Sequence, residues 1–283
     1  MNIYDETKFI LKRYHLSANK RLGQNFLVDD EAIKKIVEAA NITNNDLIIE
    51  IGPGLGTLTN VMLEKAGKVV AIELDEKMVQ VLNDRFANYD NFELINEDVM
   101  KVNLKDLIKK EKASQIRTAK VVANLPYYIT TPIIMKLLED KLDIESITVM
   151  IQKEVADRLV TNPGTGDTGA ITYSISYYTE PTRITEVPNT SFIPQPEVNS
   201  TVIKLDVLDR PRVEVSDEAL LFKVIKAAFM QKRKTLLNSL ANSGLFGTKQ
   251  DLESMLTSLN IDLNKRAEKL TLEEFANIAN YLA

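Results

Sequence analysis

A glycine-rich turn between a buried strand and a helix is the feature that most constrains the fold of this chain. Residues Leu47–Ile51 form a short, mainly apolar run typical of a buried parallel strand, and Thr57–Ala66 read as the helix that follows it. Between them lies Gly52–Gly56, whose alternating glycines let the backbone approach a ligand closely. This unit predicts the first strand of a doubly wound sheet, with a ligand at its carboxyl end. The spacing G-x-G-x-G differs from the G-x-G-x-x-G of dinucleotide-binding turns, which disfavours a pyrophosphate ligand.

Carboxylates follow the next two predicted strands. Glu73 ends the apolar run Val69–Ile72, and Asp98 follows Phe92–Ile95. The first acid can accept hydrogen bonds from both ribose hydroxyls of an adenosine group, and the second can accept one from an adenine amine. Each acid taken alone could instead be a helix N-cap or a solvated loop residue. Their shared position at strand ends favours an adenosine-binding cleft.

The segment Asn124–Tyr127 (Asn-Leu-Pro-Tyr) follows a predicted strand and predicts a site for a planar amine. The exocyclic amine of adenine is a weak nucleophile, because its lone pair is delocalised into the ring. The Asn124 side-chain carbonyl and the Leu125 backbone carbonyl could hold its N–H groups. Pro126 would fix the turn, and Tyr127 would stack on the base. The motif favours a methyltransferase that needs no strong general base, because the amine becomes acidic only as the methyl group transfers; the four residues alone leave open a simple strand-ending turn.

The remaining pattern predicts two domains. Strand-like and helix-like segments alternate, which is typical of a mostly parallel sheet with helices on both faces. Expected helices lie at 29–40, 76–87, 131–139 and 153–160, and expected strands at 119–123, 147–151, 183–187 and 201–207, the last two as an antiparallel addition. After residue 208 only helical patterns follow, at 217–230, 233–240, 249–259 and 272–282. We predict an α/β domain over residues 1–208 and a small all-helical domain over residues 209–283.

The composition excludes several kinds of site. The chain has 283 residues, no cysteine and a single histidine, His15. Thiol chemistry, disulfides and Cys/His zinc sites are therefore excluded, and we expect no metal. No apolar stretch approaches membrane-spanning length, and the N-terminus has no signal-peptide pattern. We expect a soluble, cytoplasmic protein that is monomeric, because nothing in the sequence requires a partner chain.

The formal net charge of −5 is unusual for a nucleic-acid-binding protein. Basic residues nevertheless gather near both ends of the chain, and the residues predicted to bind RNA are Lys20, Arg21, Lys232, Arg233 and Lys234. Each group could instead be a solvated helix face, which is the usual explanation for a charge run. Acidic character elsewhere opposes indiscriminate binding and favours an RNA target that is structured and already assembled.

Five segments of the chain occur in the order typical of one known family. They are 23–27 (Gly-Gln-Asn-Phe-Leu), 50–56 (Glu-Ile-Gly-Pro-Gly-Leu-Gly), 124–129 (Asn-Leu-Pro-Tyr-Tyr-Ile), 152–156 (Gln-Lys-Glu-Val-Ala) and 192–198 (Phe-Ile-Pro-Gln-Pro-Glu-Val). Because of these segments, the chain from Gly23 to about Leu240 resembles the ribosomal RNA adenine dimethyltransferase family. Within that family it is most similar to the bacterial small-subunit members. The resemblance implies a class I S-adenosylmethionine-dependent methyltransferase with a Rossmann-like fold.

The resemblance also implies which residues hold the cofactor S-adenosylmethionine. They are Gln24, Asn25, Leu27, Gly52, Gly54, Glu73, Asp98 and Asn124. Asn25 and Leu27 would close over the cofactor, and the two glycines would pass beneath its methionine part. Glu73 would bind its ribose and Asp98 its adenine, while Asn124 would lie beside both the methyl donor and the target amine.

Phe192 matches the aromatic residue that the family places opposite the tyrosine of the Asn-Leu-Pro-Tyr motif. The resemblance therefore implies that the target adenine is flipped out and stacked between Tyr127 and Phe192. Without the resemblance, an aromatic residue in this setting would more often be a core anchor. The expected catalytic residues are thus Asn124, Leu125, Pro126, Tyr127 and Phe192.

The resemblance further implies a substrate: two adjacent adenosines in the terminal hairpin of 16S rRNA, each methylated twice on N6 within a late small (30S) ribosomal subunit particle. An alternative within the same class is the antibiotic-resistance methyltransferase that modifies one adenine of 23S rRNA. A second alternative is a ribosome-assembly factor whose binding matters more than its catalysis. The glycine spacing disfavours a nicotinamide-dependent oxidoreductase.

Overall fold

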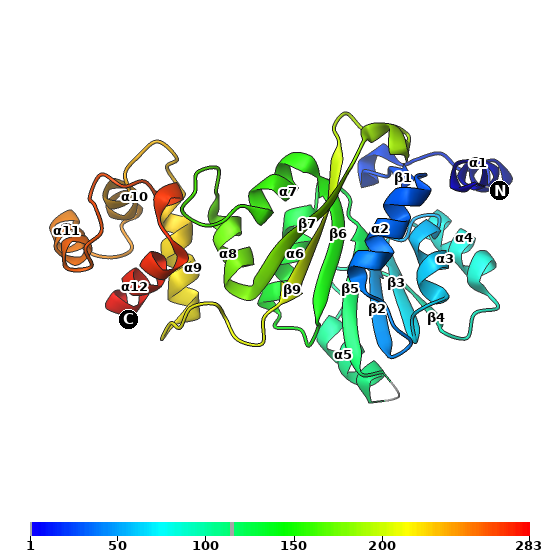
Figure 1. Cartoon of the computed structure of the whole chain (residues 1–283), viewed down its shortest axis with the longest axis horizontal. Helices are drawn as coiled ribbons and strands as arrows, with labels where there is room; N and C mark the ends of the chain where they lie inside the picture. Colours follow the sequence, from blue (N-terminus) through cyan, green and yellow to red (C-terminus); the bar gives the residue numbers. More distant parts are fainter. Residues whose placement is uncertain (1, 114–115) are drawn as a thin grey trace. The chain divides into compact units, whose positions relative to one another are not determined.

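The computed structural model describes residues 2–113 and 116–283, with the side chain of Lys20 excepted (Figure 1). Contacts between Cα atoms divide the chain into two compact units. The first comprises Met1–Ala156 and Thr182–Val207, and the second comprises Asp157–Pro181 and Leu208–Ala283. Residues 157–181 thus belong with the C-terminal helices by their contacts, although the sequence pattern did not separate them from the larger domain. The domain boundary after residue 208 stays a prediction.

A seven-stranded sheet in the order β4-β3-β2-β5-β6-β9-β7 forms the centre of the first unit. Its strands are β2 (Asp46–Ile51), β3 (Lys68–Glu73), β4 (Phe92–Asn96), β5 (Thr118–Asn124), β6 (Ser146–Gln152), β7 (Thr179–Val187) and β9 (Ser200–Val207). Strands β4, β3, β2, β5 and β6 pair in parallel, and β9 pairs antiparallel with β6. This confirms the predicted doubly wound, mostly parallel sheet. The strand order reverses at β2, whose neighbours β3 and β5 lie on its two sides, so the ligand site of such sheets is expected at the carboxyl end of β2.

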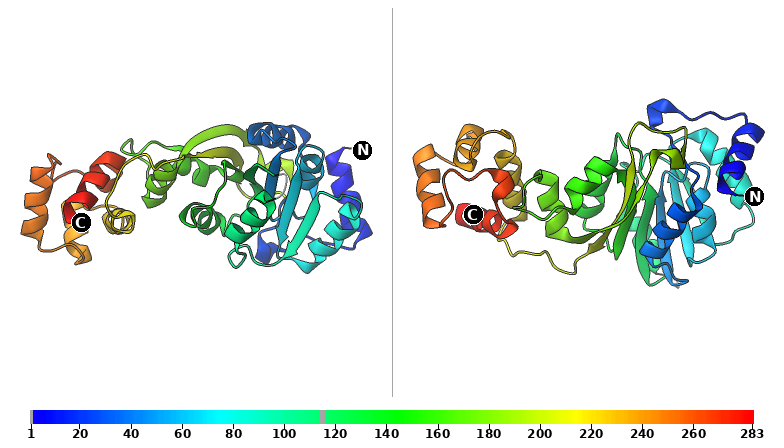
Figure 2. Two further views of the ribbon diagram at one scale, coloured as in Figure 1. Left: turned by 90° about the horizontal axis from the view of Figure 1, so that it is seen from below. Right: turned by 45° about the horizontal axis from the view of Figure 1, so that its top comes forward.

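Helices cover both faces of this sheet (Figure 2). The helices of the first unit are α1 (Ile3–Arg13), α2 (Asp30–Ala40), α3 (Thr57–Leu63), α4 (Glu76–Phe86), α5 (Leu104–Lys112), α6 (Thr130–Glu139) and the start of α7 (Lys153–Val160), with 3-10 turns at Lys20–Leu22 and Asn189–Ser191. Two short strands, β1 (Phe26–Leu27) and β8 (Phe192–Ile193), form a separate antiparallel pair. Helix α2 is capped by Asp29, whose side chain accepts a hydrogen bond from the Ala32 amide.

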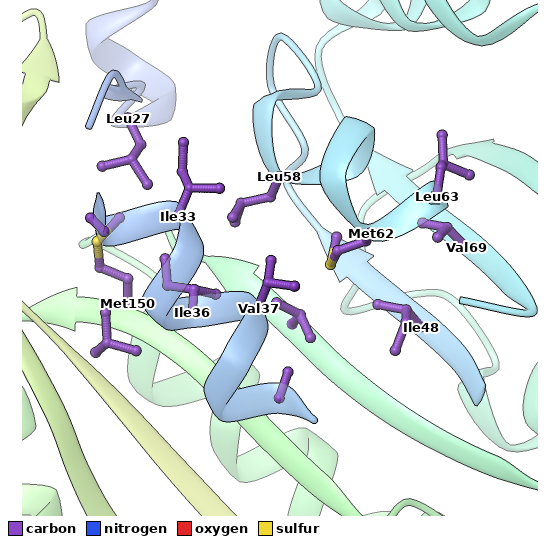
Figure 3. Close-up of a cluster of buried hydrophobic side chains, with 14 of the residues drawn as sticks. Leu27, Ile33, Ile36, Val37, Ile48, Leu58, Met62, Leu63, Val69 and Met150 are labelled. Atoms are coloured by element: carbon purple, nitrogen blue, oxygen red, sulfur yellow. The ribbon is translucent and has the colours of Figure 1, made fainter. Parts of the chain in front are cut away.

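A hydrophobic cluster joins the helices of one face to the strands beneath them (Figure 3). Ile33, Ile36 and Val37 lie on one side of α2 and are almost fully buried. They pack with Ile48 of β2 and with Met150 of β6. Leu27 of the short strand β1 joins the same cluster. The core thus ties the segment 23–27 to the sheet, although about twenty residues separate that segment from β2 in the sequence.

The second unit has an aromatic centre. Its helices are the end of α7, α8 (Ala170–Tyr178), α9 (Glu218–Ala228), α10 (Leu236–Ser243), α11 (Lys249–Ser258) and α12 (Leu272–Leu282), with a 3-10 turn at Ala267–Lys269. The fully buried Tyr173 of α8 contacts Phe229 and Phe275, with ring centroids 5.4 and 4.9 Å away. Its hydroxyl donates to the carbonyl oxygens of Ala267 and Leu270 at 3.0 and 2.8 Å. These contacts explain why α8 belongs to this unit.

Some elements differ from the sequence prediction. Helices α1, α5 and α8 were not predicted, and α8 carries no charged residue and is buried along most of its length, so its sequence shows no polar face. The helix expected from Arg233 begins only at Leu236, because Thr235 caps it with its side chain. The three basic residues before the cap therefore lie in a connecting turn.

The third glycine of the turn is expected to tolerate no side chain. Gly56 has φ +81°, and a Cβ there would lie 2.5 Å from the ring of Phe86 and 2.9 Å from Leu82. We expect Gly56→Ala to destabilise the protein by roughly 2–4 kcal/mol, because left-handed backbone and overpacking both cost energy. The matched control is Gly244→Ala, which has φ +67° but no atom within 4 Å of the added Cβ. Urea unfolding should show a loss of about 1 kcal/mol for the control; equal losses would mean that the ring of Phe86 moves aside without cost.

Candidate active site

A cavity lies at the carboxyl ends of β2, β3 and β5, where the strand order reverses. Its lining includes residues 22–27, the turn 50–55, the acids Glu73 and Asp98, and the segment 124–129. All of these belong to the first unit. The structure therefore brings together three of the sequence motifs and both predicted strand-end acids, as expected for the ligand site of a doubly wound sheet.

The turn after β2 forms the floor of this cavity. Gly52 and Gly54 have φ values of +67° and +58°, which residues with a side chain rarely adopt. The Gly52 amide donates to the carbonyl of Ile72 in β3 at 2.9 Å, so the turn is fixed to the neighbouring strand. A Cβ on Gly54 would lie 3.4 Å from the ring of Phe26. The turn thus offers bare backbone to a ligand, with an aromatic ring close beside it.

The two strand-end acids are held by backbone amides. Glu73, which is 6% exposed, accepts hydrogen bonds from the amides of Gly54 at 3.1 Å and Asp75 at 2.8 Å. Its burial raises the pKa of the carboxyl above the ordinary value, against the opposing effect of these hydrogen bonds. Asp98 accepts from the Met100 amide at 2.9 Å and is partly exposed. Both acids are therefore oriented by backbone amides at the cavity.

Asn124 is the last residue of β5, and one hydrogen bond orients its side-chain amide. Its Nδ2 donates to the backbone carbonyl of Asn25 at 3.1 Å, which links the segment 23–27 to the Asn-Leu-Pro-Tyr turn. Within the described part of the chain, neither Oδ1 of Asn124 nor the carbonyl oxygen of Leu125 accepts a hydrogen bond. The two acceptors that the sequence predicted for an amine are thus both unoccupied, and both residues line the cavity.

Pro126 and Tyr127 fix the turn that carries these acceptors. The carbonyl of Pro126 accepts from the Ile129 amide at 3.2 Å and from the Thr130 hydroxyl at 3.1 Å, where α6 begins. The Tyr127 hydroxyl lies 2.7 Å from Oγ of Ser200 in β9. Burial raises the pKa of the phenol, which keeps it neutral. The half-buried ring of Tyr127 is therefore anchored at its outer end and lines the cavity.

Phe192 lies outside the residues that line this cavity. It is 3% exposed and packs in the hydrophobic cluster with Leu27, which is opposite it in the β1–β8 pair, and with Met150 and Val202. In this conformation it acts as a core anchor, the alternative that the sequence left open. Its stacking on a flipped base stays a prediction, and stacking would require the ring to leave the cluster.

A conservative variant separates these two roles of Phe192. Phe192→Leu keeps an apolar side chain of similar size, so we expect it to cost less than about 1.5 kcal/mol of folding free energy. If the ring also stacks on the target base, the variant loses about 1–3 kcal/mol of base capture, seen as a lower rate with subsaturating RNA. Urea unfolding and methyl-transfer rates measure the two effects. A folded variant with an unchanged rate would leave Phe192 in the core alone.

The segment 22–27, which ends in β1, also lines the cavity. Gln24 donates from Nε2 to Asp75 at 2.8 Å and accepts from the Asn19 amide at 2.8 Å, so its side chain is already engaged in local contacts. Asn25 donates to the carbonyl of Gly23 at 3.1 Å, and Leu27 is 4% exposed. The structure places all three at the cavity. Their cofactor contacts stay predictions.

The structure adds one cavity residue that the sequence reasoning did not single out. Glu50 lies in the buried strand β2, is 1% exposed, and accepts a hydrogen bond from the Thr59 hydroxyl at 2.5 Å. Burial, with a further contribution from the negative charge of Glu73, raises the pKa of the Glu50 carboxyl to about 8. An acid flanked on both sides by apolar residues of a buried strand was the sequence signal that could have revealed it.

The charges of the cavity favour a cationic ligand. Glu50, Glu73 and Asp98 all belong to its lining, and that lining, as far as the structure describes it, contains no lysine, arginine or histidine. Glu50 and Glu73 are buried, and removing a carboxylate from water is costly unless a positive charge compensates it. An adenosine derivative that carries a positive charge fits this set of donors and acceptors.

The predicted RNA-binding residues lie elsewhere. Lys20 falls outside the residues whose side chains are described, and Arg21 is exposed just before the segment 23–27. Lys232, Arg233 and Lys234 are exposed in the turn before α10, and the two lysines line a separate cavity within the second unit. Their RNA contacts stay predictions.

Neither a membrane-spanning helix nor a metal cluster occurs in the described part of the chain. No helix there is both long enough and apolar enough to cross a bilayer. Over the same residues, no group of three or more His, Cys, Asp or Glu side chains is arranged to hold a metal ion.

Comparison with known proteins gives consistent matches over almost the whole chain. Residues 15–283 match the family model described as ribosomal RNA adenine dimethylase. A ribosomal RNA small subunit methyltransferase A of Alkaliphilus oremlandii is 48% identical over 278 residues, which cover 98% of this chain and 96% of that protein. The protein of the same name from Clostridioides difficile is 45% identical over 282 residues, covering 100% and 96%.

Solved structures agree with these sequence matches. A dimethyladenosine transferase from Plasmodium falciparum has a TM-score of 0.73 at 25% identity and covers 89% of this chain and 95% of its own. The 23S rRNA methyltransferase ErmE has a TM-score of 0.68 at 21% identity, covering 91% and 99%, which shows a shared fold.

Proposed function

Because the chain belongs to the ribosomal RNA adenine dimethylase family, we propose that it transfers methyl groups from S-adenosylmethionine to the N6 amine of adenosines in small-subunit ribosomal RNA. The observation that carries this proposal is a pair of acceptors, Asn124 Oδ1 and the Leu125 carbonyl, that line an acidic cavity and accept no hydrogen bond from any described residue. Acceptors of this kind hold an exocyclic amine by its two N–H groups.

The finer target is two adjacent adenosines in the 3′-terminal hairpin of 16S rRNA, each methylated twice within a late 30S particle. The relatives named small subunit methyltransferase A, which match along nearly the whole chain, support this target over 23S rRNA. The basic residues Arg21, Lys232, Arg233 and Lys234 would contact the RNA backbone. We propose a monomeric, cytoplasmic enzyme that uses no metal.

The donor set of the cavity fits S-adenosylmethionine. Glu73 would accept hydrogen bonds from ribose hydroxyls and Asp98 from the adenine amine. The bare backbone of Gly52 and Gly54 would admit the methionine part, and Gln24, Asn25 and Leu27 would close the opposite side. When bound, the cofactor supplies an electrophilic methyl group on a positively charged sulfur.

The protein's own contribution to the chemistry is to orient and desolvate the target amine. Asn124 Oδ1 and the Leu125 carbonyl would accept from the two N–H groups, which favours localisation of the nitrogen lone pair out of the plane of the ring. Pro126 keeps both acceptors in place through its contacts with the start of α6. Tyr127, anchored to Ser200, would stack on the base and exclude water. The amine proton would leave to solvent after methyl transfer.

The test of this proposal is the transfer of labelled methyl from S-adenosylmethionine to under-methylated small subunits. Free 16S rRNA and large-subunit RNA serve as parallel substrates. We expect label as dimethyladenosine in the small subunit alone. Label in 23S rRNA would instead indicate the resistance enzyme, and tight subunit binding without any label would indicate an assembly factor.

A further inference from the structure

Glu50 is a buried acid with no cation beside it. It lies at the last but one position of β2, opposite Ala71 of β3 and Val122 of β5, and its side chain is closed off from solvent. Within the described residues it takes part in no ion pair, and its hydrogen-bond partner is the neutral Thr59 of α3. An acid in this setting favours its neutral form, because ionisation would leave a buried charge uncompensated.

The titratable group that acts on Glu50 is an acid as well. Glu73, on the adjacent strand β3, raises the pKa of Glu50 through its negative charge, in addition to the larger effect of burial. Thr59 from α3 opposes this only through hydrogen bonding. A ligand that enters the cavity with a positive charge would remove the electrostatic penalty on Glu50, whereas a neutral ligand would not.

S-adenosylmethionine and its product differ by one charge. The cofactor carries a sulfonium, whereas S-adenosylhomocysteine carries an uncharged thioether, and the adenosine, ammonium and carboxylate groups are common to both. We propose that Glu50 is the residue that distinguishes the two, being neutral in the free cavity and ionised when the cationic cofactor is bound. This inference rests on the proposed function and concerns the same cavity.

The proton balance of the proposal is simple. Binding of S-adenosylmethionine to the protein with neutral Glu50 releases one proton from its carboxyl to solvent. After methyl transfer the sulfur is uncharged, and Glu50 regains a proton from solvent. The product then lies beside a neutral carboxyl without an ion pair to hold it, which favours its release before the next methylation of the same target.

Calorimetric titration of the full-length protein with each ligand tests this directly. Titrations near pH 7 in buffers of different ionisation enthalpy should show close to one more proton released for S-adenosylmethionine than for S-adenosylhomocysteine. From about pH 6.5 to about pH 8.5, the affinity for the cofactor relative to the product should rise by roughly tenfold or more. In Glu50→Gln, a neutral variant of similar shape, the proton difference should vanish, and the affinity ratio should fall by about tenfold and stay flat with pH.

Asp98→Asn is the matched control. Asp98 is proposed to contact the adenine that both ligands share, so this variant should weaken both by a similar factor and leave their ratio unchanged. A melting-temperature measurement without ligand checks that each variant is folded.

The inference and the proposed function can fail separately. If wild-type protein binds neither ligand, the proposed function fails. If it binds both but Glu50→Gln leaves their ratio and the proton difference unchanged, Glu50 is a structural residue and the inference is overturned. Equal weakening of both ligands by Glu50→Gln would overturn it as well, because the residue would then not sense the charge on sulfur.

Discussion

Replacing Asn124 with alanine is expected to lower the rate of methyl transfer by roughly 100-fold or more, the usual effect of removing one preorganised polar group from an active site. The affinity for S-adenosylmethionine should change by less than about tenfold, or about 1.4 kcal/mol. The physical reason is that the proposed task of Asn124 Oδ1 is to accept from the target amine, whereas Glu73, Asp98 and the glycine turn are the residues proposed to hold the cofactor. Single-turnover rates on small subunits and calorimetric cofactor titration measure the two quantities.

Asn45→Ala is the matched control for this experiment. Asn45 is an exposed residue that precedes β2, at the opposite end of the strand from the cavity. The control should retain both activity and cofactor affinity. If Asn124→Ala lost cofactor binding as severely as methyl transfer, its role would lie in holding the segment 23–27 through the carbonyl of Asn25 rather than in holding the amine.

Replacing Glu50 with glutamine is expected to stabilise the folded protein at alkaline pH. Burial raises the pKa of Glu50 from 4.5 to about 8. At a pH between these two values, Glu50 is therefore protonated in the folded state and ionised in the unfolded state. Wild type therefore loses stability as pH rises from about 4.5 to about 8. Because one pKa unit corresponds to about 1.4 kcal/mol, we expect Glu50→Gln to gain at least about 2 kcal/mol on wild type between about pH 5.5 and about pH 8.5.

Urea unfolding at both pH values measures this difference in stability. A second buried acid, Glu111, serves as a control for which replacement by glutamine is expected to lower the stability. Glu111 forms ion pairs with Lys68 and Lys110, which lower the pKa of its carboxyl against the effect of burial. The stability that Glu111 contributes is present above its unfolded pKa and is lost as pH falls. Glu111→Gln should therefore be less stable than wild type at both pH values. If Glu50→Gln and wild type were equally stable at both pH values, water would have to reach the Glu50 carboxyl.

The sequence by itself determined the scaffold and most of the cavity. Alternation of apolar strands with amphipathic helices predicted the doubly wound sheet. The spacing of apolar residues and the length of each segment distinguish a strand from a helix without knowledge of the rest of the chain. The turn Gly52–Gly56, the acids Glu73 and Asp98, and Asn124–Tyr127 could be placed together, because each follows a parallel strand and the carboxyl ends of such strands meet at one edge. Each of these motifs can be recognised locally in the sequence, and the parallel arrangement of the strands then predicts that they lie together in space.

Only the tertiary structure decided which side chains are buried and which remain available. It places Phe192 in the cluster with Leu27, and it shows that Nδ2 of Asn124 binds Asn25 while Oδ1 accepts from none of the described residues. It assigns α8 to the helical unit through Tyr173, and it shows Glu50 buried without an ion pair to any described residue. Each of these depends on contacts between residues far apart in the chain. The burial and the electrostatic environment of a side chain depend on all of these long-range contacts together. A local pattern of residues does not specify them.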